Sequence, residues 1–275
     1  MIPQNLLQNP LALTTQKCTL GCPILDRCLA GGVPCNSITE LVAESGSGKT
    51  QLCLQLVLSA QLPTSLGGLA ASSLYIHSEF PFPSRRLQQL SQSFRSSYSH
   101  VLDSEYNPLD FVLVRGVQSA DQLFDVLLKM DSVLLRPPTQ LPVRLIVIDS
   151  IAALFRGEFE NTPFDLKRRS SLFFKISGKL KALAERVGNL GSLWSSGRRV
   201  CAALGLSWAN CVNSRLFLSR NEEIVGEVTG LGGVGAGDTV SRLTRRHLHV
   251  IFAPHLPESS CEFVISREGV LGVER

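Results

Sequence analysis

The segment Ala43-Glu44-Ser45-Gly46-Ser47-Gly48-Lys49-Thr50 carries the strongest structural signal in the chain. It follows a short β-like run at residues 37–42 and precedes a leucine-rich run at residues 50–61. A glycine-rich loop between a strand and a helix, ending in Gly-Lys-Thr, is typical of the P-loop. Backbone N–H groups of such a loop, together with the dipole of the following helix, form a concave site for phosphates. A chance Gly/Ser loop is the alternative, and the flanking strand and helix patterns argue against it.

We predict that nucleotide contacts come from this loop and the residue after it: Ala43, Glu44, Ser45, Gly46, Ser47, Gly48, Lys49, Thr50 and Gln51. Lys49 is expected to reach the β and γ phosphates, and Thr50 to offer its hydroxyl to Mg²⁺. The opening position departs from the usual motif because it is alanine instead of glycine. If that position needs a positive φ, alanine costs on the order of 1 kcal/mol. Nucleotide binding would then be weakened without being lost.

Strand and helix patterns alternate outward from this loop. Helices are expected at residues 50–61, 85–93, 120–135 and 172–187, and strands at residues 37–42, 73–77, 110–114, 144–149, 215–218, 247–252 and 261–265. Strands that are continuous apolar runs and alternate with helices indicate a mostly parallel sheet covered on both faces. The leucine-rich helix after the loop is apolar on too broad a surface for a surface helix, so we expect it to be buried on most of its face. The predicted fold class is α/β.

Two acidic residues follow predicted strands. Asp149 ends the apolar run at residues 145–148, at the carboxyl edge where ligands of parallel sheets lie, so it is expected to hold a water on Mg²⁺. Capping of the next helix is its alternative role. Glu79 lies just past the run Tyr75-Ile76-His77, where a carboxylate can act as general base toward water. Its alternative is an exposed loop glutamate.

Composition limits the class of protein. With 275 residues and 44% hydrophobic content, the chain is long enough for one large domain. The net charge of +4 neither implies nor opposes binding to nucleic acid. The N-terminus lacks a secretory signal pattern and no apolar run is long enough for a membrane span, so we expect an intracellular protein without membrane contact. The eight cysteines form no C-x-x-C pair and are expected to be reduced structural thiols, and His247 and His249 lack a third nearby ligand.

Several motifs together resemble those of the eukaryotic RecA-like recombinases and their paralogues. The resemblance extends from about Leu20 to Val273 and rests on Gly31-Gly32 before residues 37–40, residues 48–51, Tyr75-Ile76 with Glu79, residues 145–150, and residues 253–257 with Gly269-Val270. It implies a RecA-type P-loop NTPase core at residues 20–275, with a mostly parallel central sheet, helices on both faces and antiparallel C-terminal strands. Residues 1–19 are then an N-terminal linker.

The resemblance also implies a chemistry and a biological role. Glu79 matches the catalytic glutamate of the family, Lys49 and Thr50 match its phosphate and Mg²⁺ residues, and Asp149 matches its second acid. ATP and Mg²⁺ are the implied cofactors, and Lys49 is assigned to catalysis with Glu79. The implied activity is that of a DNA-dependent ATPase acting in homologous recombination repair of double-strand breaks. The implied partners are another recombinase paralogue, in a hetero-oligomer, and single-stranded or branched DNA bound through the complex. The implied location is the nucleus, with cytoplasm and mitochondrion as further compartments.

Residues 156–170 match the first DNA-facing loop of the family. The basic triplet Lys167, Arg168 and Arg169 agrees electrostatically with contact to phosphates. A solvated helix start is an equally good interpretation of the same triplet. A glycine-rich stretch at residues 226–237 is expected to be a mobile loop.

Two family features are expected to be absent. The core begins almost at once, without the N-terminal helical domain and aromatic polymerisation motif of the family. Residues 188–195 stand where the family has an apolar strand that ends in Asn-Gln and senses the γ-phosphate. We therefore expect residues 188–200 to be irregular, the sheet to lack this strand, and DNA and ATP binding to be poorly coupled.

Three hypotheses follow for the chain. It is a weak P-loop ATPase, a nucleotide-binding scaffold subunit with little or no hydrolysis, or a defective truncated isoform.

Overall fold

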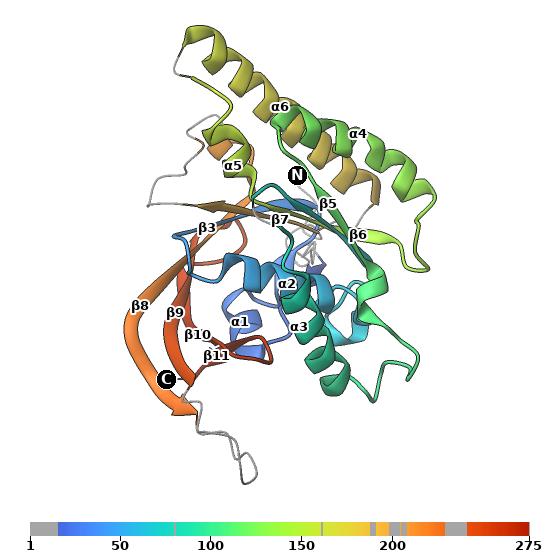
Figure 1. The fold of residues 1–275 in the computed structure, drawn as a ribbon, viewed down its shortest axis with the longest axis vertical. Helices are drawn as coiled ribbons and strands as arrows, with labels where there is room; N and C mark the ends of the chain where they lie inside the picture. The colour runs from blue at the N-terminus through green and yellow to red at the C-terminus, as the bar shows by residue number, and fades with distance from the viewer. Residues whose placement is uncertain are drawn as a thin grey trace, which may run out of the picture.

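A computed structural model of the protein describes residues 16–79, 81–160, 162–187, 191–197, 204, 208–228 and 241–274. The apolar runs form one nine-stranded sheet with helices on both of its faces (Figure 1). The helices are α1 (Pro23–Cys28), α2 (Lys49–Ser59), α3 (Ser84–Ser97), α4 (Ala120–Leu135), α5 (Ile151–Arg156) and α6 (Pro163–Val187). Two short 3-10 helices cover Thr64–Leu66 and Pro108–Phe111.

The strands of the main sheet are β3 (Ser37–Ala43), β4 (Ser72–His77), β5 (Val112–Gly116), β6 (Val143–Asp149), β7 (Gly191–Gly197), β8 (Ser214–Val228), β9 (Ser241–Phe252), β10 (Ser259–Ile265) and β11 (Val270–Val273). Their order is β11-β10-β9-β8-β3-β7-β6-β4-β5. The six strands from β8 to β5 are parallel, whereas β9, β10 and β11 are added antiparallel. The predicted α/β fold with antiparallel C-terminal strands is therefore confirmed.

Two hydrophobic cores lie on opposite faces of the sheet. The core under α2 and α3 contains every leucine of α2, and Leu52, Leu54 and Leu56 are at most 1% exposed. The prediction that this helix is buried on most of its face is thus confirmed. Full burial of a leucine side chain contributes about 1.5–3 kcal/mol, so α2 is anchored firmly beneath the sheet. The opposite core packs α4, α5 and α6 on the other face (Figure 1).

Residues 191–197 form a strand, although residues 188–200 were expected to be irregular. They form β7, which pairs in parallel with β3 on one side and with β6 on the other. The segment lacks β-branched residues, which is why its sequence does not indicate a strand. Between two parallel neighbours the backbone groups find partners on both edges, and an unpaired buried backbone group is costly. The expectation that the sheet lacks a strand here is therefore wrong, while residues 188–190 and 198–200 lie outside the described residues.

Two other expected boundaries also shift. Lys17 and Cys18 form β1, which pairs antiparallel with β2 (Val33–Pro34), and the N–H of Leu20 donates to Asp26 Oδ1 at 2.7 Å. Residues 17–19 therefore belong to the folded core and not to a linker. The expected mobile loop at residues 226–237 begins inside β8, and its residues 229–237 lie outside the described part of the chain. No helix among the described residues is long and apolar enough to cross a membrane.

A buried charged network fastens β3 to β8. The Glu40 side chain on β3 is fully buried and accepts a hydrogen bond from Arg215 Nε at 2.6 Å. The indole Nε1 of Trp208 donates to the other carboxylate oxygen at 3.1 Å. A buried carboxylate that loses its cation is left with an uncompensated charge, so this network makes the protein sensitive to loss of Arg215.

We predict that Arg215→Ala lowers the free energy of unfolding by about 3–5 kcal/mol, because Glu40 then remains buried without its ionic partner. Urea unfolding of the purified protein measures the change. Arg168→Ala is the matched control, because its ion pairs with Asp121 and Glu158 lie at the surface, and pairs of this kind contribute about 0–1 kcal/mol each. Equal stability of the two variants would contradict the assignment of Glu40 and Arg215 as a fastening pair.

Candidate nucleotide-binding site

The phosphate loop connects the end of β3 to the start of α2. Gly46 has a φ of 79° and Gly48, the N-cap of α2, has a φ of 101°. Residues other than glycine rarely adopt this left-handed backbone conformation. A Cβ atom on Gly48 would also lie 2.7 Å from Ile265 Cδ1. Both glycines are therefore required by the backbone path, as expected for a loop that turns its N–H groups inward.

Ala43 sits at the end of β3, upstream of this turn. It is fully buried, and its partners in the sheet are Leu218 of β8 and Gly197 of β7. Among the described residues other than glycine, a positive φ occurs at Ala30, Asn36 and Ala70, so Ala43 has ordinary strand geometry. The condition under which alanine would be strained is therefore not met, because the chain leaves the sheet only after this residue.

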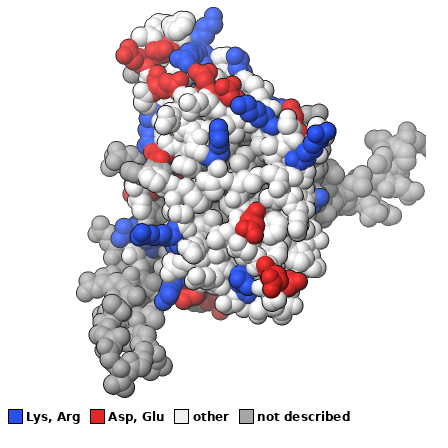
Figure 2. Space-filling model, turned by 45° about the vertical axis from the view of Figure 1, so that its right-hand side comes forward, with Lys and Arg blue, Asp and Glu red and all other residues white. Residues whose placement is uncertain are grey.

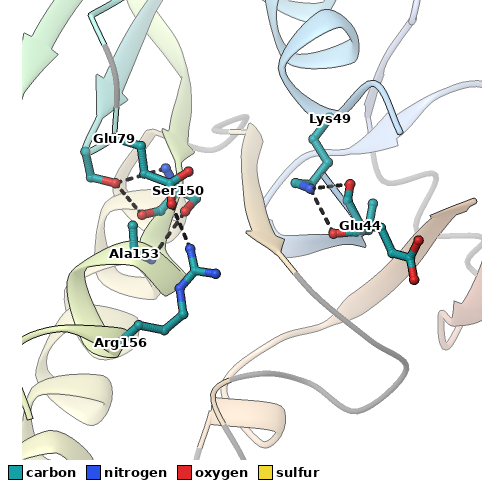
Figure 3. Close-up of polar contacts among 8 residues, drawn as sticks. Glu44, Lys49, Glu79, Ser150, Ala153 and Arg156 are labelled. Atoms are coloured by element: carbon teal, nitrogen blue, oxygen red, sulfur yellow. Dashed lines mark hydrogen bonds and ion pairs between the residues drawn. The ribbon is translucent and has the colours of Figure 1, made fainter. Parts of the chain in front are cut away.

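Lys49 is folded back onto the loop. Its Nζ donates to the carbonyl oxygens of Ala43 at 2.8 Å and Glu44 at 3.0 Å, while the Glu44 carboxylate points away (Figure 3). Burial lowers the pKa of Lys49 from its ordinary value, and the charges of Asp149, Cys53 and Glu79 oppose that shift. The ammonium group thus lies at the mouth of the loop, on contacts that a phosphate oxygen can replace.

Thr50 and Asp149 meet at the carboxyl edge of the sheet. Thr50 Oγ1 donates to Asp149 Oδ2 at 2.7 Å, and the phenol of Tyr75 on β4 donates to the same oxygen at 2.7 Å. Burial raises the pKa of Tyr75 well above its usual value, so the phenol remains a donor. The alternative role of Asp149 as a helix cap does not hold, because Ser150 is the N-cap of α5 and accepts from the N–H of Ala153. The hydroxyl and the carboxylate are oxygen ligands of the kind that Mg²⁺ prefers.

Glu79 lies two residues past the end of β4. Its Oε1 pairs with Arg156 Nη2, at the end of α5, at 2.7 Å (Figure 3). Both side chains are about half exposed, at 45% and 44%. Ser78 Oγ donates to the carbonyl of Ser150 at 2.6 Å and holds this corner to the start of α5. The structure thus places Glu79 in an ion pair that its sequence context did not indicate.

The remaining residues of the predicted site differ in exposure and in their contacts. Glu44, Ser45 and Gly46 are exposed, whereas the Ser47 hydroxyl is buried and has no hydrogen-bond partner among the described residues. Gln51 accepts from Arg86 Nε at 2.7 Å, which ties the start of α2 to α3. Inward glycine turns, a lysine at the mouth and paired oxygen ligands match the needs of a nucleotide with Mg²⁺.

The basic triplet is largely engaged within the fold. Arg168 Nη2 pairs with Asp121 at 2.6 Å and with Glu158 at 3.3 Å, and the Arg169 guanidinium lies over the Phe173 ring. The triplet lies in the first turns of α6, and blue and red side chains are interleaved at the top of the molecule in Figure 2. The structure favours the solvated helix start for this triplet over a free phosphate-binding strip.

The two histidines of β9 are also engaged. The rings of His247 and His249 stack at 5.7 Å, and His247 Nε2 lies 3.4 Å from Glu262. No group of three or more His, Cys, Asp or Glu side chains that could hold a metal ion occurs in the part of the chain that the structure describes. The cysteines in that part are free thiols.

The glycine-turned loop, the adjoining acid at the end of β6 and the antiparallel C-terminal strands define a RecA-type P-loop core. The family model described as Rad51 matches residues 13–190. The chain belongs to the Rad51 family.

Its curated relatives include DNA repair proteins from plants and mammals. The chain is 51% identical to the DNA repair protein XRCC3 homolog of Arabidopsis thaliana, over 99% of this chain and 97% of that protein. It is 35% identical to the DNA repair protein XRCC3 of Bos taurus, over 97% of this chain and 77% of the relative. It is 30% identical to the DNA repair protein RAD51 homolog 2 of Mus musculus, over 76% of this chain and 66% of the relative. The chain is therefore a recombinase paralogue of DNA repair by homologous recombination.

The alignments also differ in extent along the chain. The match to the Arabidopsis thaliana relative runs over 301 residues, more than the 275 of this chain. That relative therefore carries residues that this chain lacks within the aligned span. The Rad51 match ends at residue 190, directly before β7. The family match therefore does not extend over β7.

Proposed function

We propose that the protein binds MgATP at the P-loop and hydrolyses it slowly as a subunit of a homologous-recombination complex. The observation that supports this most directly is the convergence of Lys49, Thr50 and Asp149 at one edge of the sheet, where Asp149 Oδ2 lies 2.7 Å from Thr50 Oγ1. Lys49 and the N–H groups at Gly46 and Gly48 would hold the phosphates, and Thr50 and Asp149 would hold Mg²⁺. When bound, Mg²⁺ neutralises charge on the phosphate oxygens.

Two residues of the chain have to rearrange in this scheme. Lys49 leaves the carbonyls of Ala43 and Glu44 to reach the phosphates. Glu79 leaves Arg156 to accept a proton from water. The ion pair of Glu79 and Arg156 is half exposed, and pairs of this kind are worth at most about 1 kcal/mol. Release of Glu79 from Arg156 therefore costs little free energy.

We predict that Lys49→Ala removes most of the stabilisation that MgATP or MgADP gives the protein. A ligand at 100 times its Kd stabilises the native state by about 2.7 kcal/mol, and loss of a charge-assisted phosphate contact costs about 1.5–3 kcal/mol. Thermal unfolding with and without nucleotide measures the effect. Lys181→Ala, at an exposed position of α6, is the control and should respond like the wild type.

The same measurement separates the hypotheses. Equal nucleotide shifts in the wild type and in Lys49→Ala would place the nucleotide elsewhere. A wild type that MgATP does not stabilise at all would support the defective truncated isoform.

We predict that Glu79→Gln keeps nucleotide affinity and loses hydrolysis by about 10²–10⁴-fold, because a general base acts in the transition state. Phosphate release by the protein co-purified with its partner measures the rate. Glu105→Gln, at an exposed loop position, should leave the rate unchanged. A wild type that binds nucleotide but shows no hydrolysis in the complex would replace the ATPase proposal by the scaffold proposal.

DNA should change this rate by less than about tenfold, or roughly 1.4 kcal/mol of barrier. The register places Ser195 beside Asp149 and Gly197 beside Ala43, where the family pattern has an Asn-Gln pair. Contacts that differ between ATP and ADP are needed to shift a conformational equilibrium. A stronger stimulation by DNA that Glu79→Gln abolishes would show that another segment senses the γ-phosphate.

We further propose that the partner is another recombinase paralogue and that it adds a strand to β5. β5 is the last strand of the main sheet, and Val114 on it is 41% exposed. A groove of about 590 Å³ runs beside it, with Val117, Val126 and Met130 among its lining residues. Polar side chains line the groove as well, among them Gln122 and Lys129. An open strand edge beside such a groove is the surface that strand addition uses. DNA contact through the complex and a nuclear location, with cytoplasm and mitochondrion as further compartments, belong to the same proposal.

We predict that Val114→Lys reduces co-purification with the partner paralogue at least tenfold while the isolated protein keeps its unfolding temperature. A lysine at a sheet edge opposes pairing with another strand. Pull-down from co-expressing cells, with quantification of both chains, measures the effect. Leu135→Lys, at an 81% exposed position outside the groove, is the control. Unchanged co-purification of Val114→Lys would exclude β5 as the docking edge.

A further inference from the structure

Two arginines face each other across β8 and β9 beside the phosphate loop. Arg220 and Arg246 are directly opposed partners in the antiparallel register. We propose that this pair is a second anion-binding element of the nucleotide site and contacts the phosphate chain from the side opposite Lys49. The inference rests on the proposed function, because it assumes that the loop holds a nucleotide.

The alternation of side chains along the strands places the pair on the inner face. Leu216 and Leu218 precede Arg220 with a period of two, and both belong to the core beneath the sheet. Leu248 and Val250 follow Arg246 in the same way and belong to the same core. Side chains at such positions point to one face of a strand pair. The two arginines therefore extend the inner face of β8 and β9 beyond the apolar core.

The end of that face is next to the loop. An atom at the Cβ position of Gly46 would lie 3.5 Å from Arg220 Nη1. An atom at the Cβ position of Gly48 would lie 3.7 Å from Arg246 Cδ. The arginines thus flank the two glycines whose turns direct the backbone N–H groups inward. Arg220 is exposed and Arg246 is half-buried, so the pair is open to a ligand.

The charges of the pair are not balanced within the described residues. Like charges directly opposite each other destabilise a strand pair. Burial lowers the pKa of Arg246, and the charge of Arg220 lowers it further. Neither guanidinium forms an ion pair with a carboxylate in the part of the chain described, whereas the neighbouring Arg245 pairs with Glu262 at 3.0 Å. A bound polyanion would relieve the repulsion between the two arginines.

Arg246 also has a hydrogen-bond donor that no described residue uses. Arg246 Nη1 donates to the carbonyl of Thr244 at 2.7 Å, and its Nε is buried without a partner among the described residues. Guanidinium groups form charge-assisted, often bidentate, hydrogen bonds with phosphate. Phosphate oxygens held at Gly46 and Gly48 are the nearest anions that the proposed function supplies.

The test compares the affinities of the full-length wild type, Arg246→Met, Arg246→Lys and Arg220→Ala for three ligands: MgATP, MgADP and inorganic tripolyphosphate. Arg246→Met keeps the length of the side chain and removes its charge. We expect Arg246→Met and Arg220→Ala to weaken all three ligands at least tenfold, and Arg246→Lys to retain part of the affinity. Unfolding temperatures without ligand should not fall, because the like-charge pair is removed. Arg267→Ala, which removes an exposed charge near the end of β10, should change affinity by less than twofold.

Each other outcome counts against the pair. Wild-type affinity in both Arg246→Met and Arg220→Ala, with nucleotide still bound, would overturn this inference and leave the proposed function intact. Weaker binding of MgATP and MgADP with unchanged binding of tripolyphosphate would assign the arginines to the base or ribose and overturn the phosphate contact. Absence of any nucleotide binding by the wild type would instead refute the proposed function and this inference together.

Discussion

The common direction of β3, β7, β6 and β4, which are neighbours in this order, is the constraint on which the site depends. Because the strands run in one direction, each delivers its carboxyl end to the same edge of the sheet. The register sets His77 of β4 beside Asp149 of β6, which places Glu79 just beyond that edge. The loop after β3 meets the same edge, so Thr50 and Asp149 contact each other although 99 positions separate them in the chain. Any change that shifts this register would separate the phosphate loop from its acids.

The sequence predicts the phosphate loop, the acid after β6 and helix α2, because each of them has a short sequence pattern of its own. A Gly-rich loop after a strand, an acid after four apolar residues and a leucine-rich helix each have a pattern within about ten residues. Lys49, Thr50 and Asp149 are therefore found from the sequence and lie together in the structure. The fit of Ala43 could not be judged, because a sequence does not say at which residue the chain leaves the sheet.

What the sequence did not predict depends on distant partners. The pairing of Glu79 with Arg156 joins residues 77 positions apart, and no local pattern connects them. The two interpretations of the basic triplet could not be separated from the sequence, because Asp121 and Glu158, which neutralise Arg168, lie on other segments. Strand β7 was missed for a different reason. Its pairing comes from the backbone groups of β3 and β6, and its own side chains carry no strand signal.

The central position of β7 has a consequence for how this protein could diverge from its relatives. A site between two parallel strands accepts a segment through main-chain hydrogen bonds, which are common to all residues except proline. The architecture can therefore tolerate exchange or shortening of this segment without loss of the sheet. The side chains that such an exchange brings to the carboxyl edge would differ, beside an unchanged phosphate loop. If the chain holds a nucleotide as proposed, exchange of β7 would alter the contacts at the carboxyl edge while leaving the phosphate loop in place.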